Sequence, residues 1–340
     1  MKKGQVSPVF KYVFGLIVGA LFLLFFFGFA MQYKNTASSV EVRQIVYGFD
    51  DDLTAFSVTG DSSWEKRFPY SVSITFDNGQ IISGDFAKST SHIVFAPIEV
   101  SGNLMYIWTK RWSSPFDVDN LYYITGGKER YFLVFDDDSM SFVSELVSDY
   151  DGVPDSFSAS SVLLTALADS SQISTLAGDA LSYNKVKFVF FSEDSESILT
   201  AKINIENKFS NAESLIVLPS EDYENGIVTF PDGEQAVYFG KPLLLGAIFA
   251  EDSASYRYGF DSALHKFNLV SQVYQGKASF LNGRTGGVCA NEYSGIYSTL
   301  TSLESTTIPD SLNEIASYVE TIDNIDDQNK ALGGECPEVF

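Results

Sequence analysis

The sequence predicts an α+β protein with a single N-terminal transmembrane helix, followed by a two-lobed extracytoplasmic domain: a β-rich lobe, then an α+β lobe that ends in helices. Three observations support this prediction. Tyr12 to Met31 contain no charged side chain, apolar and polar residues alternate from Tyr70 onward, and apolar residues from Phe260 onward recur at helical spacing. These patterns are typical of a membrane-spanning helix, of strands and of amphipathic helices, respectively.

The chain divides into five segments. With 340 residues it is longer than the single cores of most domains, so we expect two lobes beyond the anchor. The segments are a basic cytoplasmic segment (1–11), a transmembrane helix (12–31), an amphipathic stalk helix (36–58), a β-rich lobe (59–150) and an α+β lobe with C-terminal helices (151–340). The boundary between the lobes follows from the cluster of Asp, Gly and Pro residues at Asp149 to Ser156.

The apolar run has the length of a bilayer crossing. Twenty helical residues rise about 30 Å, which matches the hydrocarbon core. Lys2, Lys3 and Lys11 precede the run and an acidic domain follows it. The positive-inside bias therefore predicts a single-pass protein of the cell membrane, with a cytoplasmic N-terminus and an extracellular C-terminal domain. Its expected partners are the lipid bilayer and other envelope proteins.

Two further readings of this run remain open. "GFA" at Gly28 to Ala30 is similar to a signal-peptidase site, although an apolar run of this length favours retention. In a retained anchor, Gly15 and Gly19 form a GxxxG pair that would allow two helices to self-associate, and a chance glycine pair is the alternative.

The first residues add a resemblance to a known family. "KKGQVSPV" ahead of an apolar helix resembles the signal of archaeal type IV prepilins. The resemblance implies cleavage between Gly4 and Gln5, with the apolar helix kept as anchor and filament core and continued into a globular head. Lys11 and the lack of an acidic residue near Gln5 depart from the family's pattern.

Local patterns place the main elements beyond the anchor. Ser38 and Glu41 have capping-box spacing ahead of the stalk helix. "YSVSITFDNGQIISG" predicts a hairpin with a type I′ turn at Asn78-Gly79, and "SFVSELV" is expected to be a strand of the same lobe. In the second lobe, residues 156–183 are expected to be helical with a break near Asp169 to Ser171, and "ILTAKINI" is expected to be a strand. A second hairpin is expected at Asp232-Gly233, and Ser311 with Glu314 begins the last helix.

Charge excludes some partners, and the cysteines suggest a crosslink. The formal net charge of −22 argues against nucleic acid, because phosphate binding needs clustered Lys and Arg. Such an acidic excess keeps a cell-surface protein soluble, and it also occurs in salt-adapted organisms. Cys289 and Cys336 are the only cysteines. An even count in an extracytoplasmic domain predicts a disulfide, and two unpaired buried thiols are the alternative.

No catalytic signature is recognisable. His92 and His265 lack partner motifs, and no serine lies in a G-x-S-x-G elbow. Asp50 to Asp52 and Asp136 to Asp138 each place three acids in succession, and the group Asp149, Asp151 and Asp155 is expected to be a solvated turn. The last group spaces its carboxylates partly as calcium requires, without a complete loop. We therefore expect no catalytic residues, no metal and no cofactor.

One short stretch is a candidate contact surface. In "YIWTKRWSSPF", Trp108 and Trp112 flank Lys110 and Arg111 within an otherwise acidic domain. Trp and Arg are favoured at binding hot spots, so this patch could bind a sugar, a peptide or a partner protein. The alternative is ordinary strand alternation with one half in the core.

Taken together, the sequence favours a non-enzymatic, membrane-anchored protein with a structural or adhesive role, which the prepilin resemblance narrows to a pilin-like subunit. A membrane-tethered binding module for a sugar, peptide or partner protein is the alternative. A tethered hydrolase has less support, since no motif indicates one.

Overall fold

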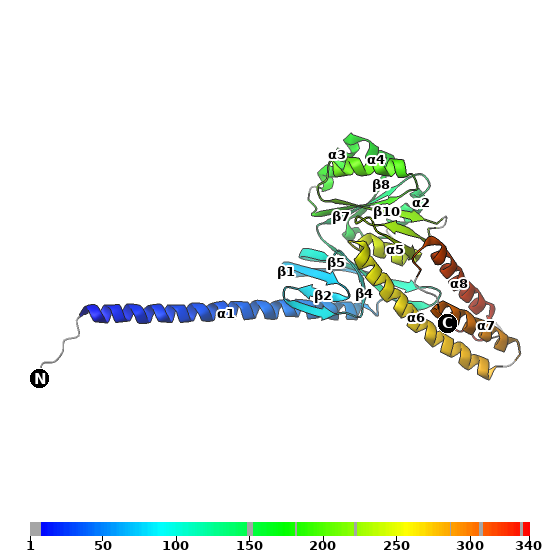
Figure 1. The fold of residues 1–340 in the computed structure, drawn as a ribbon, viewed down its shortest axis with the longest axis horizontal. Helices are drawn as coiled ribbons and strands as arrows, with labels where there is room; N and C mark the ends of the chain where they lie inside the picture. The colour runs from blue at the N-terminus through cyan, green and yellow to red at the C-terminus, as the bar shows by residue number, and fades with distance from the viewer. Residues whose placement is uncertain are drawn as a thin grey trace.

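The computed structural model has one long helix projecting from a compact head (Figure 1). It describes residues 8–147, 152–180, 182–220, 223–285, 287–305, 309–333 and 336–340.

The projecting element is α1, Pro8–Phe56, a single helix of 49 residues. At 1.5 Å per residue it is about 74 Å long. The segments 12–31 and 36–58, which the sequence predicts as separate helices, both fall in this region, and no break divides them before Phe56. The polar stretch between them, "QYKNTASS", contains neither proline nor glycine. Polar composition alone does not end a helix, because the backbone ladder continues through any residue that keeps its N–H group.

The first sheet lies against the end of α1. Its strand order is β3-β2-β1-β5-β6-β4, antiparallel except where β4 pairs with β6. The strands are β1 Ser62–Asp77, β2 Gln80–Ser83, β3 Phe86–Ser89, β4 Ile93–Phe95, β5 Glu99–Ser113 and β6 Asp117–Gly126. The predicted hairpin is confirmed: Asp77 pairs with Gln80, and Asn78 and Gly79 have φ values of 44° and 71°. Both angles are positive, as a type I′ turn requires.

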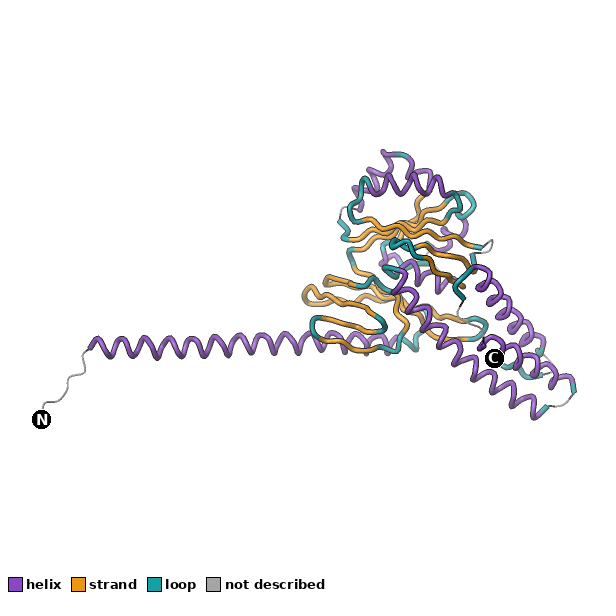
Figure 2. Tube along the Cα trace, viewed as in Figure 1, coloured by secondary structure: helices purple, strands orange, loops and turns teal. Residues whose placement is uncertain are grey.

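The second sheet has the order β12-β11-β10-β9-β7-β8, with parallel pairing from β8 to β10. Its strands are β7 Glu129–Phe135, β8 Ala159–Leu163, β9 Lys185–Phe191, β10 Ala212–Pro219, β11 Asn225–Thr229 and β12 Gln235–Phe239. The hairpin predicted at Asp232-Gly233 joins β11 to β12. The remaining elements are α2 Met140–Leu146, η1 Asp155–Phe157, η2 Leu164–Ala168, α3 Ser170–Ala180, α4 Ser195–Glu206, α5 Gly240–Phe249, α6 Ser253–Arg284, α7 Val288–Ser305 and α8 Leu312–Ala331. Figure 2 separates the helices from the two sheets.

Three local predictions were wrong in whole or in part. "SFVSELV" forms α2, and the first part of the stretch predicted to be helical, 156–183, contains strand β8, whereas its later part forms η2 and α3 on either side of Asp169. "ILTAKINI", predicted as a strand, lies in α4, where the side chain of Asp194 accepts hydrogen bonds from the first turn. Ile198, Ala201 and Ile205 are the buried residues of α4. Their spacing of three and four is helical, and it prevailed over the β-branched composition on which the strand prediction rested.

The chain passes between the sheets earlier than the predicted lobe boundary of 150/151. Strand β6 ends at Gly126 in the first sheet, and β7 begins at Glu129 in the second. The largest apolar cluster includes side chains from both sheets, so they share a core instead of having one core each. Helix α5 lies between the sheets, and its residues from Leu243 to Phe249 are buried (Figure 1). The shared core explains why turn composition did not locate the boundary.

Two smaller clusters cover the other faces. One packs the end of α1 on the first sheet, and the other packs α3 and α4 on the outer face of the second sheet. Helices α6, α7 and α8 lie beside both sheets, with α6 and α7 forming a long hairpin (Figure 1). The predicted disulfide is confirmed between Cys289 and Cys336, whose Cα atoms are 5.8 Å apart. It holds the C-terminal residues against α7, where Tyr293 also donates a hydrogen bond to the Pro337 carbonyl at 2.8 Å.

Candidate functional site

The most distinctive surface of the protein is the N-terminal part of α1. Phe10–Phe29 has a mean hydropathy of 2.5, and none of it is buried against the head. Within the described ranges, this is the one helix long and apolar enough to cross a membrane. Large side chains such as Leu23 and Phe25 are 72% and 66% exposed. Soluble proteins rarely expose a continuous apolar surface of this kind, and a helix of this length and composition could span a membrane or belong to a signal sequence.

The C-terminal part of the same helix has the opposite environment. Val46, Phe49 and Leu53 are completely buried in the cluster that α1 shares with the first sheet. The Phe49 ring lies 5.9 Å from Phe76, and the Phe56 ring stacks 3.6 Å from Trp64 of β1. The stalk is therefore an integral part of the head's core.

Polar contacts reinforce this attachment. Asp50 forms a 2.5 Å ion pair with Lys88 of β3, and Asp52 pairs with Lys66 of β1. Burial alone would raise the pKa of Asp50, but the hydrogen bonds from Lys88 and Thr90, together with the nearby positive charge of Lys88, outweigh it and hold the pKa below its usual value. Tyr122 of β6 donates to the carbonyl of Leu53 at 2.8 Å. The run Asp50 to Asp52 lies in the helical segment predicted at 36–58, and two of its acids hold the helix to the head.

The two histidines occupy different environments. Nε2 of His92 is 3.1 Å from the Thr54 hydroxyl on α1, and its ring lies 5.0 Å from Tyr122. Burial lowers the pKa of His92, which favours the neutral ring at this joint. His265 lies exposed on α6. Within the described ranges, no three His, Cys, Asp or Glu side chains gather as metal ligands.

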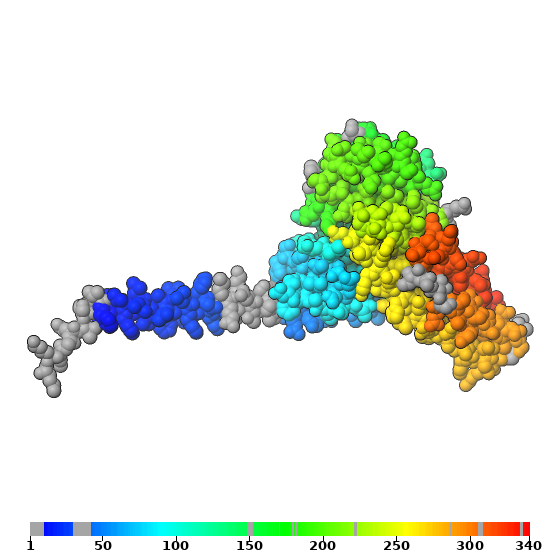
Figure 3. All heavy atoms as spheres, in the orientation of Figure 1, coloured from blue at the N-terminus to red at the C-terminus, as the bar shows by residue number. Residues whose placement is uncertain are grey.

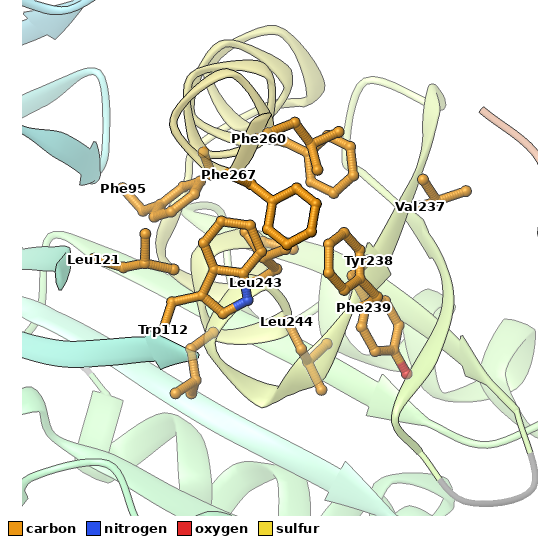
Figure 4. Packing of buried hydrophobic residues seen from close by; sticks show 14 of the residues in the cluster. Phe95, Trp112, Leu121, Val237, Tyr238, Phe239, Leu243, Leu244, Phe260 and Phe267 are labelled. Carbon is orange, nitrogen blue, oxygen red and sulfur yellow. The ribbon is translucent and has the colours of Figure 1, made fainter. Parts of the chain in front are cut away.

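The structure corrects the predicted tryptophan surface. Trp108 and Trp112 are only 5% and 1% exposed. Trp108 packs against Tyr123, and Trp112 lies 6.0 Å from the ring of Phe267, within the shared core (Figure 4). On the opposite face of β5, Ile107 and Thr109 are buried as well, Ile107 in the cluster that includes α1, so alternation could not distinguish two covered faces in this part of the strand. The indole faces are therefore not available to a sugar or a partner.

The two charged residues of that patch lie nearer the surface. Lys110 Nζ is 3.8 Å from a carboxylate oxygen of Asp61, with its side chain 16% exposed. The Arg111 guanidinium is 3.2 Å from Asp117. Both are thus engaged with acids of their own chain.

A cleft opens where the end of β5 meets α2, the start of α5 and α8. Its volume is about 490 Å³. It is lined by Lys110, Trp112, Ser113, Ser114, Glu145, Leu146, Glu224, Phe239, Gly240, Lys241, Pro242, Leu245, Val319, Ile322 and Asp323. Trp112 Nε1 is buried and has no hydrogen-bond partner among the described residues. The cleft combines cations, anions and an apolar floor, which suits a small polar ligand.

Buried charges also lie between β7, β9 and the end of α5. Glu129 accepts hydrogen bonds from the Thr125 hydroxyl at 2.7 Å and from the Tyr131 hydroxyl at 3.1 Å, and burial raises its pKa. Lys187 donates to the carbonyl of Ala250, and burial lowers its pKa to about 8. These two buried charged residues were not predicted from the sequence. Glu129 and Lys187 do, however, stand within the apolar runs "ERYFLVF" and "KVKFVFF", and a charged residue in such a run indicates a buried charge.

Several predicted features fall elsewhere. Gly4 and Gln5 lie outside the described residues, as do Asp149 and Asp151. The run Asp136 to Asp138 precedes α2, where Asp136 accepts a hydrogen bond from the backbone N–H of Ser139 at 2.9 Å. Gly15 and Gly19 lie on the exposed part of α1, with no head atom within 4 Å of a Cβ placed at either position.

No family model matches this chain, and no curated protein or solved structure is significantly similar to it.

Proposed function

We propose that this chain is a single-pass, membrane-anchored protein with a non-enzymatic structural or adhesive role, built like a pilin subunit. The observation that carries the proposal is the division of α1. One continuous helix has an exposed apolar half and a half whose side chains are completely buried in the head. A rigid helix with these two environments holds the head at a fixed position relative to the membrane.

The lipid bilayer is the first partner of the exposed half. Twenty apolar residues satisfy their backbone groups within the helix, as a bilayer requires. When such helices pack side by side, each removes the other's apolar surface from its surroundings, and Gly15 and Gly19 would allow a close approach. Lys2, Lys3 and Lys11 favour a cytoplasmic N-terminus, which leaves the head and its disulfide on the extracytoplasmic side.

The N-terminus of the native protein tests the proposal. Mass spectrometry of the protein purified from membranes should find Gln5 as the first residue. Replacing Gly4 by valine should block that cleavage while leaving the protein in the membrane fraction. A chain that begins at Met1 would reject the pilin-like form and keep the anchor. A chain that begins at Met31 in the soluble fraction would reject both.

The cleft supports a second candidate function, a tethered binding module. The specific observation is that Trp112, whose buried Nε1 has no hydrogen-bond partner among the described residues, lines a cleft together with Lys110 and Lys241. Lys241 already lies 2.5 Å from Glu145, so a ligand would compete for a paired cation. A tethered hydrolase receives less support from the described residues, because His92 bonds a threonine that belongs to the attachment of α1.

Tryptophan fluorescence of the full chain tests the second candidate. A panel of monosaccharides, disaccharides and short peptides should include one compound that changes the emission at millimolar concentration or below. Lys241→Ala should weaken that response, whereas Arg111→Ala, outside the cleft, should leave it unchanged. If no compound changes the emission, or if both variants respond alike, the cleft is not a binding site for these classes.

A further inference from the structure

Helix α6 carries an exposed apolar stripe. Leu269, Val273 and Phe280 are 49%, 70% and 56% exposed. They are four and seven residues apart, so they lie on one side of the helix. Figure 3 shows the hairpin of α6 and α7, in yellow and orange, projecting from the head at the end away from α1. The stripe is thus accessible on the part of the head farthest from the proposed membrane.

The charge around this stripe differs from that of the whole chain. Residues 262–291 contain no Asp or Glu, although the chain has 44 acidic residues. Lys277 and Arg284 follow Leu269 by eight and fifteen positions and so fall beside the stripe. The Arg284 guanidinium lies 4.5 Å over the Phe280 ring. The stripe is thus an apolar surface with a basic edge on the side of Lys277 and Arg284, while on its other side Gln272 donates a hydrogen bond to Glu304 of α7 at 2.7 Å.

Helix α4 carries a matching surface. Leu199 and Ile203 are 60% and 51% exposed and lie one turn apart. Glu196 and Glu206 are exposed on the same side, and the partly covered Lys202 lies at its other edge. In Figure 1, α4 covers the outer face of the second sheet, at a different end of the head from the hairpin of α6 and α7. The two surfaces therefore cannot contact each other within one molecule.

We infer that the occupant of the α6 stripe is the α4 face of a second copy of this chain. Leu199 and Ile203 would pack on the apolar stripe, while Glu196 and Glu206 would face Lys277 and Arg284. Two α6 stripes brought together would place cations against cations, and two α4 faces would place acids against acids, so pairing between like surfaces is disfavoured. The complementary surfaces favour the unlike pairing.

A contact between two different surfaces has a consequence for assembly. Each copy keeps one α4 face and one α6 stripe unused, so contacts of this type extend into a row or close into a ring. The surfaces are small, and an interface below about 1,200 Å² is weak on its own. The inference rests on the proposed anchoring for its strength, because confinement to one membrane raises the effective concentration of the heads.

Site-directed crosslinking tests the contact in the full chain. Val273→Cys and Leu199→Cys chains with different epitope tags are expressed in one cell and treated with a short bismaleimide. The native cysteines are bonded to each other and remain unreactive. We expect a dimer that carries both tags, and no dimer when Ser279→Cys, exposed on α6 but off the stripe, replaces Val273→Cys. A Val273→Cys dimer with itself would overturn the unlike pairing, and absence of any dimer would overturn the contact.

Charge exchange provides the second measurement. Lys277→Glu with Arg284→Glu in the Val273→Cys chain should abolish the mixed dimer. Glu196→Lys with Glu206→Lys in the Leu199→Cys chain should restore it. Unchanged yield in the first case, or no recovery in the second, would overturn the charge pairing. The same experiment with purified chains at high concentration in detergent separates this inference from the proposed function, since it requires neither N-terminal processing nor a membrane.

Discussion

Replacing Phe49 by alanine perturbs the half of α1 that belongs to the head. Phe49 is completely buried and lies 5.9 Å from the ring of Phe76. Truncating a buried phenylalanine removes its transfer free energy and leaves a cavity, which together cost about 4 kcal/mol. Phe25, on the same helix, is 66% exposed and lies in the half that we propose spans the membrane, so Phe25→Ala is the matched control.

The assay is urea unfolding of the full chain in detergent micelles, followed by tryptophan fluorescence. Phe49→Ala should lower the free energy of unfolding by about 4 kcal/mol, and for a head of this size it should lower the melting temperature by about 10 °C. Phe25→Ala should change the free energy of unfolding by no more than about 0.5 kcal/mol, as is usual for exposed positions. Equal losses for both variants, or no loss for Phe49→Ala, would refute the division of α1 into two functional halves.

Three further predictions concern the head alone. Replacing Cys289 and Cys336 by serine, which opens a loop with a sequence separation of 47 residues, should lower the free energy of unfolding by about 4 kcal/mol in urea titrations; an unchanged midpoint would contradict this. Burial lowers the pKa of Lys187 from an ordinary 10.5 to about 8. The free energy of unfolding should therefore rise from pH 8 to pH 10, because in that interval the unfolded chain binds more protons than the folded chain. Below pH 8 this contribution is constant, and Lys187→Met should remove the rise when urea midpoints at pH 7 and pH 9.5 are compared; the same rise in both proteins would reject this origin. Gly259→Ala should lower the melting temperature because its Cβ would come within 2.5 Å of a buried phenylalanine ring, whereas Gly276→Ala, with no atom within 4 Å, should not, and equal effects would contradict the packing.

Much of the local structure could be predicted from the amino-acid sequence. The Asn78-Gly79 pair predicted its hairpin because a two-residue type I′ turn requires positive φ at both positions, and Asn and Gly tolerate positive φ better than other residues. Cys289 and Cys336 could pair only with each other once they were oxidised. The errors arose in short apolar segments such as α2 and α4, which fit a strand or a helix equally well until the surface that covers them is known.

The candidate surfaces were less predictable than the elements. The sequence suggested a binding patch at Trp108 and Trp112, both of which are buried in the structure. The pattern of a strand does not show whether one or both of its faces will be covered by other elements. Lys110 and Trp112 line a cleft only because α8, two hundred residues later in the chain, comes to lie beside the end of β5.

The sequence by itself determined the long apolar helix near the N-terminus, the acidic character of the head, its hairpins and its crosslink, because each depends on neighbouring residues or on composition. Only the tertiary structure decided that this apolar helix and the stalk are one helix, that the two sheets share a core around α5, and that an apolar stripe with a basic edge on α6 and an acidic face on α4 both remain exposed. The physical reason is that burial depends on contacts between distant segments, and no local pattern records which segments will meet.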